Sequence, residues 1–302
     1  MSTSYHVAVI GLGAMGMGAA RSCLRAGLTT YGIDLSEQAR SQLQQAGAAA
    51  VMADARPLAE TLDAVLLLVV NATQVRRILL GDEGLARHLK PGTAIMVSST
   101  IAAEEASSLA AELAQLGLPM LDAPVSGGAI KADAGEMTVM AAGADAAFDK
   151  LAPVLDAVAG KLYRVGSEPG QGSTVKIIHQ LLAGVHIAVA AEAMALASKA
   201  GVPLDLMYDV VTHAAGNSWM FENRMPRVLT GDYQARSAVD IFVKDLTLVA
   251  DTAKALRFPL PLASTALNMF LSASNAGHGQ EDDSAVIKTF SGIQLPGQEE
   301  RP

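Results

Sequence analysis

The sequence predicts an α/β domain built on a doubly wound parallel sheet, followed by an all-α domain, with one long helix joining the two. In the first half of the chain, short apolar runs typical of strands alternate with helical patterns, as in consecutive βαβ units. In the second half only helical patterns follow. Between the halves, residues 170–201 contain no proline and are apolar on nearly every face, which is typical of a buried central helix. We expect the domain boundary to separate residues 1–166 from residues 167–302.

The composition limits the partners and the compartment. Of 302 residues, 51% are hydrophobic and only 17% are charged, an apolar excess that suggests a homodimer or homotetramer. The formal net charge of -8 argues against nucleic acid or an anionic membrane as a partner. Cys23 is the only cysteine, so no internal disulfide is possible and a reducing compartment is favoured. The first strand begins so early that no room remains for a signal peptide, and we expect a cytoplasmic protein.

The first strand, residues 5–10, runs directly into the sequence GLGAMGMG. Gly11, Gly13 and Gly16 have the spacing G-x-G-x-x-G, and a helix over residues 14–26 is expected to follow. We expect Gly11 to make a tight turn, Gly13 to let the backbone approach a pyrophosphate, and Gly16 to let the helix pack closely. Glycine clusters also make ordinary turns, but a strand before and a helix after favour a Rossmann-type dinucleotide-binding domain. The residues between the glycines belong to the same cofactor loop: Leu12, Ala14 and Met15.

Asp34 follows the second expected strand, residues 29–33. A carboxylate at this distance from the glycine loop can accept hydrogen bonds from the hydroxyls of the adenosine ribose. It would repel the ribose phosphate of NADP, and no Arg stands immediately beside it, so NAD is the predicted cofactor. Asp34 could also be the N-cap of the next helix, which is compatible with this role.

The remaining strands are expected at residues 62–70, 94–97, 118–121, 137–141 and 161–165. The run over residues 62–70 is continuously apolar, as in a central parallel strand covered on both faces. Ligands of such sheets lie beyond the carboxyl ends of the strands, which places Asn71 and Thr100 near the cofactor. Either residue could instead cap the helix that follows it.

Two further segments carry candidate substrate-binding groups. In DAPVSGG, residues 122–128, successive N–H groups of Ser126, Gly127 and Gly128 could hold a carboxylate, although a plain turn is an equal alternative. In the long helix, Lys176, His179 and Gln180 share one face. A snorkelling or ion-paired Lys176 is the plainer reading of a lysine in a buried helix.

Two other kinds of chemistry find no support. The six histidines show no metal-ligand spacing and the single cysteine excludes thiolate sites, so no metal is expected. No G-x-S-x-G sequence is present, so a serine hydrolase is unsupported.

The helices expected after the long one cover residues 204–214, 219–229, 238–256, 261–275 and 283–291.

In their order and spacing, GLGAMGMG, the SST ending at Thr100, DAPVSGG, GQGSTVK and VKDL resemble the β-hydroxyacid dehydrogenase family over nearly the whole chain. The resemblance implies that the glycine loop binds NAD(P) and that residues 126–128 hold the substrate carboxylate. It further implies that Lys176 is catalytic and that Lys244 lies near the nicotinamide end of the cofactor. Taken alone, Lys244 would be read as a solvated helix residue. An apolar site would favour the neutral amine of Lys176, which could then accept the hydroxyl proton as hydride leaves the carbinol.

The second domain departs from the common family pattern. Many members carry Asn one turn after the catalytic Lys, where this chain has His179 and Gln180. The stretches KIIHQLLAGVHIA, AAGNSWMFENR and VDIFVKDL are similar to members that oxidise the alcohol beside the carboxylate of a four-carbon sugar acid. A polar cluster of Asn217, Ser218, Trp219 and Asn223 would suit such a substrate, although Trp219 and Phe221 are equally typical of a helical core.

Other readings stay open from the sequence. Tartronate semialdehyde or 3-hydroxyisobutyrate chemistry could use the same scaffold. A phosphorylated sugar acid, as in 6-phosphogluconate dehydrogenase, fits poorly because too few basic residues can be placed near the site. A non-catalytic NAD-binding interaction protein is the alternative outside enzymes, and a buried Lys176 beside a carboxylate-binding turn speaks against it.

Overall fold

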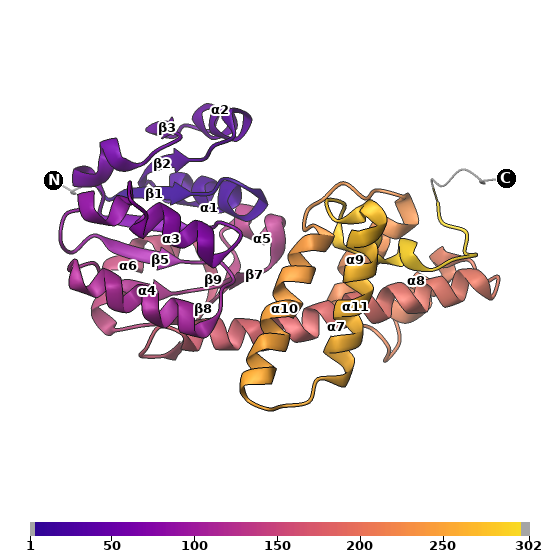
Figure 1. The fold of residues 1–302 in the computed structure, drawn as a ribbon. Coiled ribbons are helices and arrows are strands. Elements are labelled where there is room, and N and C mark those ends of the chain that lie inside the picture. Colours follow the sequence, from indigo (N-terminus) through magenta and orange to yellow (C-terminus); the bar gives the residue numbers. More distant parts are fainter. Residues whose placement is uncertain (1–3, 297–302) are drawn as a thin grey trace. The chain divides into compact units, whose positions relative to one another are not determined.

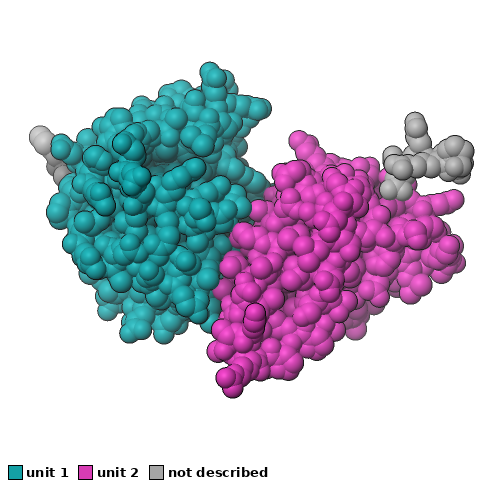
Figure 2. Space-filling model, viewed as in Figure 1, with its two compact units in different colours: residues 1–176 teal, residues 177–302 magenta. Residues whose placement is uncertain are grey.

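The computed structural model describes residues 4–296, so the outermost residues of both predicted domains, 1–3 and 297–302, lie outside the described range. The chain forms two compact units, residues 1–176 and 177–302 (Figure 2). The predicted boundary at residue 166 coincides with the end of the last strand. The first unit extends ten residues further, because the start of the long helix is hydrogen-bonded to the sheet of that unit.

One sheet forms the centre of the first unit (Figure 1). Its strands are β1 (His6–Ile10), β2 (Thr29–Ile33), β3 (Ala50–Met52), β4 (Ala64–Leu67), β5 (Ala94–Val97), β6 (Met120–Asp122), β7 (Val125–Ser126), β8 (Met137–Ala142) and β9 (Ala159–Gly166). The first six strands are parallel in the order 3-2-1-4-5-6, so the strand order reverses between β1 and β4. β8 runs antiparallel to β6 and β7, and β9 pairs with β8. The predicted doubly wound fold is confirmed, and its dinucleotide crevice belongs at the carboxyl ends of β1 and β4.

Helices cover both faces of this sheet, as the alternation of the predicted segments requires. They are α1 (Ala14–Arg25), α2 (Glu37–Gln45), α3 (Ala72–Leu80), α4 (Ala103–Gln115), α5 (Gly128–Ala134), α6 (Asp145–Val158) and the short η1 (Arg56–Thr61) and η2 (Leu85–His88). Val7 and Val9 of β1 belong to the core shared with α1 and α6. Ala8 and Ile10 belong to the core shared with α3 and α4. Buried parallel strands therefore explain the continuous apolar runs in the sequence.

The predicted strand over residues 62–70 is shorter in the structure, where β4 ends at Leu67. The N–H of Val69 donates to the Ser99 hydroxyl, and that of Val70 donates to the side-chain oxygen of Gln74. Side chains thus replace the strand ladder after β4, so apolar composition alone placed the end of the strand too late.

Every named element after the first unit is helical. These elements are α7 (Gln171–Lys199, which begins in the first unit), α8 (Leu204–Thr212), α9 (Trp219–Thr230), α10 (Val239–Ala255), α11 (Pro261–Ala273), η3 (Ser274–His278) and η4 (Asp283–Thr289). Their core centres on apolar side chains of α7, α10 and α11, and the rings of Phe242 and Phe270 stack at 5.2 Å. The predicted final helix, residues 283–291, is a 3₁₀-helix of seven residues that ends at Thr289, and Asp282 caps it by accepting from the N–H of Ser284.

Helix α7 is the one described helix that is long and apolar enough to cross a membrane. It has 29 residues, and half of its most apolar 18-residue window, with a mean hydropathy of 1.7, is buried inside the chain. The core helix of a soluble protein has the same length and composition, so these properties do not distinguish the two.

Candidate active site

Three glycines at the carboxyl end of β1 shape the loop that leads into α1. Gly11 has a φ of +90°, and its N–H donates to the carbonyl of Ile33 at 2.9 Å. A Cβ at Gly16 would lie 1.7 Å from the Gly11 carbonyl oxygen, so only glycine lets α1 pack directly on the loop. A Cβ at Gly13 would meet no atom within 4 Å. Packing within the chain therefore does not require glycine at position 13, whereas close approach of a ligand to this backbone does.

The N-terminus of α1 has the features of an anion site. Gly13 is its N-cap and supplies no side-chain hydrogen bond, and the first turn contains no acidic residue. Ala14 is exposed in this turn, Met15 is half-buried, and Leu12 is buried beneath the loop. Uncapped N–H groups and the positive end of the helix dipole favour a phosphate here. These residues fit the pyrophosphate of a dinucleotide.

Asp34 is hydrogen-bonded to the glycine loop. Its Oδ2 accepts from the N–H of Leu12 at 2.7 Å, and its Oδ1 accepts from the N–H of Ser36 at 2.7 Å. The N-cap of α2 is Ser36, whose hydroxyl accepts from the N–H of Ala39, so the reading of Asp34 as that cap is wrong. The carboxylate lies where ribose hydroxyls can donate to it.

The structure places a cation beside Asp34 that the sequence analysis missed. Arg40, in the first turns of α2, donates from one guanidinium nitrogen to the carbonyls of Asp34 and Leu35, at 2.7 and 2.9 Å. The turn between β2 and α2 reverses the chain, and this brings a residue six positions later back to Asp34. The absence of an adjacent Arg in the sequence is therefore an incomplete argument for NAD over NADP.

A pocket of about 480 Å³ extends from the glycine loop over the ends of β2, β3 and β4. Gly11, Gly13 and Asp34 line it, as expected for a dinucleotide crevice. Its other polar or charged lining residues were not predicted; they are Asp54, Arg56, Gln74, Arg77 and Glu83. Arg56 donates to Asp54 at 2.7 Å and also pairs with Glu83, so carboxylates on two segments hold its guanidinium in place.

Asn71 and Thr100 follow β4 and β5, at the same edge of the sheet. The Asn71 side-chain oxygen accepts from the N–H of Gln74 at 2.9 Å and caps α3, so the capping alternative holds for this residue. Thr100 is half-buried, and the N-cap of α4 is Ala102, so Thr100 does not cap that helix. Contact of either residue with a cofactor stays a prediction.

The turn Ser126-Gly127-Gly128 joins β7 to α5. Gly127 and Gly128 have φ of +128° and +72°, a backbone that residues with a side chain rarely adopt. A Cβ at Gly127 would press on Lys131, whereas one at Gly128 would meet no atom within 4 Å. Gly128 thus resembles Gly13, since its backbone is open to a ligand on the side where a side chain would stand.

Lys176 lies in the second turn of α7 and only 6% of it is exposed. The turn before it is held by Asp122, which is fully buried at the end of β6. Asp122 accepts hydrogen bonds from the N–H groups of Gly170 and Ser173 and from the Ser173 hydroxyl, at 2.8, 2.8 and 2.7 Å. Burial raises the pKa of the Asp122 carboxyl in spite of these donors.

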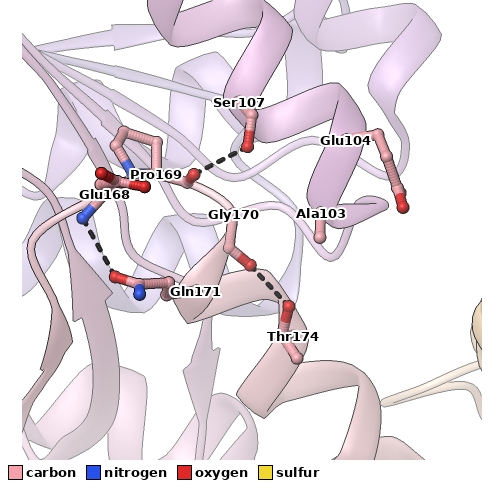
Figure 3. Close-up of a pocket in the computed structure, with 8 residues that line it drawn as sticks. All are labelled: Ala103, Glu104, Ser107, Glu168, Pro169, Gly170, Gln171 and Thr174. Atoms are coloured by element: carbon pink, nitrogen blue, oxygen red, sulfur yellow. Dashed lines mark hydrogen bonds between the residues drawn. The ribbon is translucent and has the colours of Figure 1, made fainter.

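A second pocket, of about 470 Å³, lies at the start of α7 (Figure 3). It is lined by Ala103, Glu104, Ser107, Glu168, Pro169, Gly170, Gln171 and Thr174. The Ser107 hydroxyl donates to the Pro169 carbonyl at 2.8 Å, and the Thr174 hydroxyl donates to the Gly170 carbonyl at 2.8 Å. These bonds fasten the loop before α7 to α4 and to the helix itself.

In the second unit, one hydrogen-bonded network joins the predicted residues His179, Gln180 and Lys244 through Asp245. Asp245 is 2% exposed; its Oδ2 accepts from the Gln180 amide at 2.5 Å, and its Oδ1 lies 2.7 Å from the Lys244 ammonium. The Gln180 amide oxygen lies 3.0 Å from His179 Nδ1, and because that oxygen only accepts, Nδ1 carries the proton. Lys244, with 22% of its side chain exposed, is ion-paired, so the reading of it as a solvated residue is wrong.

Asn217 and Trp219 lie at the start of α9. The Asn217 amide donates to Glu222 at 2.7 Å, and Trp219 is 51% exposed, so Trp219 is not part of the helical core. Phe221, 4% exposed, does belong to the core. The Ser218 hydroxyl caps α9 by accepting from the N–H of Phe221, which commits it to the helix.

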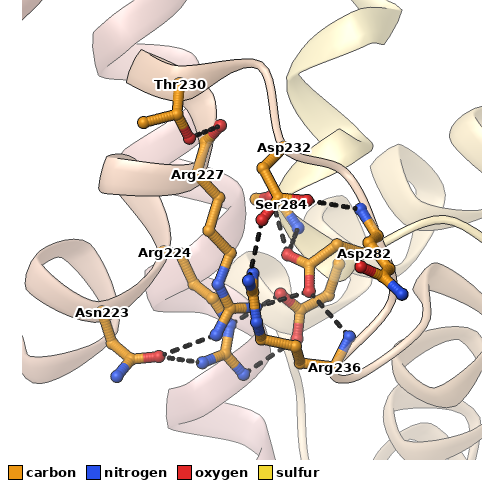
Figure 4. Close-up of polar contacts among 10 residues, drawn as sticks. Asn223, Arg224, Arg227, Thr230, Asp232, Arg236, Asp282 and Ser284 are labelled. Atoms are coloured by element: carbon orange, nitrogen blue, oxygen red, sulfur yellow. Dashed lines mark hydrogen bonds and ion pairs between the residues drawn. The ribbon is translucent and has the colours of Figure 1, made fainter.

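Asn223 belongs to a separate arginine–aspartate cluster, which we define as Asn223, Arg224, Arg227, Asp282, Asp283 and Ser284 (Figure 4). The Asn223 side-chain oxygen accepts from both arginines, and these pair with Asp283 and Asp282. The expectation that Asn223 serves the substrate is therefore not supported, because its acceptor is turned to the cluster.

Metal and thiol chemistry find no site in the described chain. Within residues 4–296, no group of three or more His, Cys, Asp or Glu side chains could hold a metal ion. Cys23 is fully buried in α1, and burial raises the pKa of its thiol to about 12, which leaves it without nucleophilic thiolate.

Known proteins match the chain in both units. A family model described as the NAD binding domain of 6-phosphogluconate dehydrogenase matches residues 6–166. One described as NAD-binding of NADP-dependent 3-hydroxyisobutyrate dehydrogenase matches residues 170–290. An L-threonate dehydrogenase of Escherichia coli O6:H1 is 72% identical over 98% of both chains, and one of Haemophilus influenzae is 67% identical over 97% of both. The chain belongs to the β-hydroxyacid dehydrogenase family.

Solved structures agree with this family. The crystal structure named 3-hydroxyisobutyrate dehydrogenase from Salmonella typhimurium is 69% identical, with a TM-score of 0.92 over 95% of this chain and all of that one. This member of the β-hydroxyacid dehydrogenase family is an NAD-dependent oxidoreductase, as its sequence predicts. The open backbone at Gly13, the uncapped start of α1 and the Asp34 carboxylate fit that cofactor.

Two carboxylates within the quoted motifs received no role from the sequence, Asp122 of the first unit and Asp245 of the second. Asp122 directly follows the apolar residues 118–121 of the predicted strand, where a charged residue needs partners, and this signal could have identified it. Asp245 follows Lys244 in a helix that reads as amphipathic, and no local pattern pairs it with Gln180, 65 residues away.

Proposed function

We propose that the protein oxidises L-threonate to 2-dehydro-L-erythronate with NAD. The identity of 67–72% to four proteins named L-threonate dehydrogenase carries this proposal. Each unit supports it separately: the first has a buried lysine and an open glycine turn, and the second has a network of amide, imidazole and carboxylate groups, and both sets suit an acid that bears several hydroxyls. 3-Hydroxyisobutyrate is the second candidate, since the 69% identical Salmonella chain carries that name.

The cofactor would be held by the first unit. Residues 11–16 and the N-terminus of α1 suit the pyrophosphate, Asp34 suits the ribose, and the pocket lined by Arg56 and Gln74 suits the adenosine end. When bound, NAD supplies the acceptor for the hydrogen and electron pair that leave the carbinol carbon. Asn71 and Thr100 stay predicted contacts at the same edge of the sheet. Lys244 stays a predicted neighbour of the nicotinamide end on the resemblance alone.

The chain's own residues would bind the acid and move one proton. The N–H groups of residues 126–128 hold the carboxylate, which orients the neighbouring carbinol. As the carbinol C–H bond breaks, the O–H proton passes to the Lys176 amine and the C=O bond forms. General acid–base assistance of this kind contributes roughly a hundred- to ten-thousandfold to the rate.

His179 and Gln180 would select the acid. The Gln180 side-chain N–H₂ donates to Asp245, so the amide oxygen of Gln180 faces His179. This oxygen accepts from His179 Nδ1, which therefore carries the proton. The Nε2 of a neutral His179 is then an acceptor, suited to a substrate hydroxyl. Asn217 and Trp219 stay candidate contacts at the start of α9. Many family members carry Asn one turn after the lysine, and Asn in place of Gln180 would shorten this side chain by one methylene.

NADH formation with a panel of acids tests the substrate. We expect L-threonate to have the highest kcat/KM among L-threonate, D-threonate, erythronate, D-glycerate, tartronate semialdehyde (read in reverse) and 3-hydroxyisobutyrate. Gln180→Asn should lower kcat/KM for L-threonate more than for 3-hydroxyisobutyrate, because it disturbs the hydroxyl-selecting network. The proposal is wrong if the shorter acids are preferred by the unmodified protein. NAD binding without turnover of any acid would instead indicate an interaction protein.

Lys176→Ala tests the proton transfer. We expect turnover to fall by roughly a hundred- to ten-thousandfold while the Kd for NAD, measured by calorimetry, stays within about twofold. Lys150→Ala is the matched control, because it removes an exposed amine from α6, which has no role in the proposed proton transfer. Near-normal turnover in Lys176→Ala would remove the lysine from the mechanism.

We also propose a homodimer or homotetramer that works in the cytoplasm. Leu182, Val189 and Leu196 recur every seven residues along one face of α7 and are 53%, 54% and 69% exposed. A second copy of this chain would cover that stripe. Light scattering should show an oligomer, and Val189→Asp with Leu196→Asp should shift it to monomers; an unchanged mass would disprove this interface.

A single cysteine, which allows no internal disulfide, supports the proposed reducing compartment.

A further inference from the structure

We propose that Asp122 is a positioning residue for the reaction: its carboxylate fixes the Lys176-bearing turn of α7 against the segment that carries Ser126-Gly127-Gly128. The inference rests on the proposed roles of Lys176 and of that turn. Asp122 itself touches neither the substrate nor the cofactor in this scheme, and it acts through the two elements that it joins.

The hydrogen bonds of the Asp122 side chain run to the start of α7. Oδ2 accepts from the N–H groups of Gly170 and Ser173, and Oδ1 accepts from the Ser173 hydroxyl. N–H groups in the first turn of a helix have no partner within the helix, and a carboxylate there also interacts with the positive end of its dipole. One buried side chain thus fastens the whole first turn to the end of β6.

Gly172 provides a second, independent constraint on the same turn. A Cβ there would lie 2.4 Å from the Asp122 carbonyl oxygen and 2.6 Å from the Met140 carbonyl oxygen. The first turn of α7 therefore lies directly on the backbone of β6 and β8. This contact gives a physical reason for glycine within the sequence GQGSTVK.

On its other side, Asp122 leads through a rigid segment to Ser126. The N–H of Ala123 donates to the Val97 carbonyl at 2.9 Å, and the Pro124 carbonyl accepts from the N–H of Met140 at 2.9 Å. β7 then pairs with β8, where Ser126 is opposite Thr138. The four residues after Asp122 are bound to the sheet, so Asp122 and the start of the glycine turn belong to one rigid segment.

Helix geometry carries the effect to Lys176. Ser173 and Lys176 are three residues apart, so they share a face and lie about 4.5 Å apart along the axis. A misplacement of about 1 Å in a reacting group can cost roughly a hundredfold in rate. Because burial raises the pKa of Asp122, keeping this charge inside costs stability, which is typical of functional groups more than of core residues.

Two substitutions test the inference by different routes. Asp122→Asn keeps the side-chain size but removes the negative charge and one of the two acceptor oxygens that hold the turn, and we expect kcat to fall about tenfold to a hundredfold. Gly172→Ala pushes the same turn outward with Asp122 intact and should lower kcat in the same way. In both variants the Kd for NAD, measured by calorimetry, should stay within about twofold. Thr93→Val is the control: it removes a buried bond to the Leu62 carbonyl and should lower Tm with kcat unchanged.

A double variant separates positioning from general damage. In a Lys176→Ala background, Asp122→Asn should cost little further turnover, because the group that it positions is gone. The inference is overturned if Asp122→Asn lowers Tm like Thr93→Val but leaves kcat intact, or if its loss is undiminished in the double variant. Normal turnover of Lys176→Ala alone would instead refute the proposed role of the lysine. If another acid replaces L-threonate as substrate, the same comparison is made with that acid.

Discussion

The glycine loop of the first unit and the arginine–aspartate cluster of the second unit are built in opposite ways. The loop uses backbone, and its residues lie within six positions of one another. The cluster uses side chains: Arg224 pairs with Asp283, 59 residues away, through bonds of 2.6 and 2.9 Å. The loop therefore depends on the absence of Cβ atoms, and the cluster depends on the presence of charges.

Asp122 of the first unit and Asp282 of the second have pKa values shifted in opposite directions. Asp122, held by N–H and hydroxyl donors, has a pKa raised by burial. Burial also acts to raise the pKa of Asp282, but Arg227 and Ser284 outweigh it, and that pKa lies below its ordinary value. A neighbouring guanidinium does not decide the direction alone, because Asp283, which is fully buried, has a pKa raised by burial although it is paired with Arg224.

The largest expected effect is in the cluster. Arg224→Met should lower the free energy of unfolding by about 3–5 kcal/mol, since it leaves Asp283, fully buried, without its cation. Urea unfolding measures this loss. The control is Arg21→Met, which breaks a half-exposed pair with Asp133 and should cost no more than about 0.5 kcal/mol. Equal losses in the two variants would contradict the role assigned to burial.

The second largest effect on stability is expected at Gly16, the glycine that close packing of α1 on the loop requires. Gly16→Ala places a Cβ 1.7 Å from a carbonyl oxygen, so the loop must move, at a cost of about 1–3 kcal/mol. We expect a lower Tm together with weaker NAD binding in calorimetry. If the variant keeps its Tm and its NAD affinity, the loop can move away from the added methyl group without cost, and packing does not require glycine at position 16.

The two carboxylates should give smaller effects with opposite dependence on pH. The stability contributed by Asp282 is present above its ordinary pKa and is lost as pH falls through its lowered pKa. The contribution of Asp122 is fully present below its ordinary pKa and is lost as pH rises through its raised pKa. The difference in unfolding free energy between the unmodified chain and Asp282→Asn should thus grow with rising pH on the acid side, and that for Asp122→Asn should shrink. Urea unfolding at several pH values measures both differences. If they change with pH in the same direction, the contrast between the two carboxylates is disproved.

The smallest effect on stability is expected at Gly13. Gly13→Ala meets no atom within 4 Å, so the unfolding free energy should change by less than about 1 kcal/mol. NAD affinity should nevertheless fall, because the added methyl stands where the backbone would approach the pyrophosphate. Paired with Gly16→Ala, this variant separates a glycine needed by the ligand from one needed by the fold. Unchanged affinity would place the pyrophosphate elsewhere.

The first unit could be predicted closely because its signals are local. A buried parallel strand must be apolar on both faces, and a tight strand-to-helix turn needs glycine at set positions, so each feature is written within a few residues. The ends of elements were less certain: β4 stops at Leu67 because Ser99 and Gln74, distant or later in the chain, take the next N–H groups. The contact of Asp34 with a ribose stays a prediction, its bond to the N–H of Leu12 was not predicted, and Arg40 beside it was missed because a turn brings it back.

By itself, the sequence determined the alternation of strands and helices apart from the short strands β3 and β7, the glycine loop, the family and the candidate lysine. Only the tertiary structure decided which polar groups meet: Asp122 with the first turn of α7, Gln180 with Asp245, and Arg224 with Asp283. The physical reason is that backbone preferences and burial act over a few neighbouring residues and leave a periodic pattern. A hydrogen bond between buried side chains depends on where the folded backbone places two distant residues, and neither residue's neighbours record its partner.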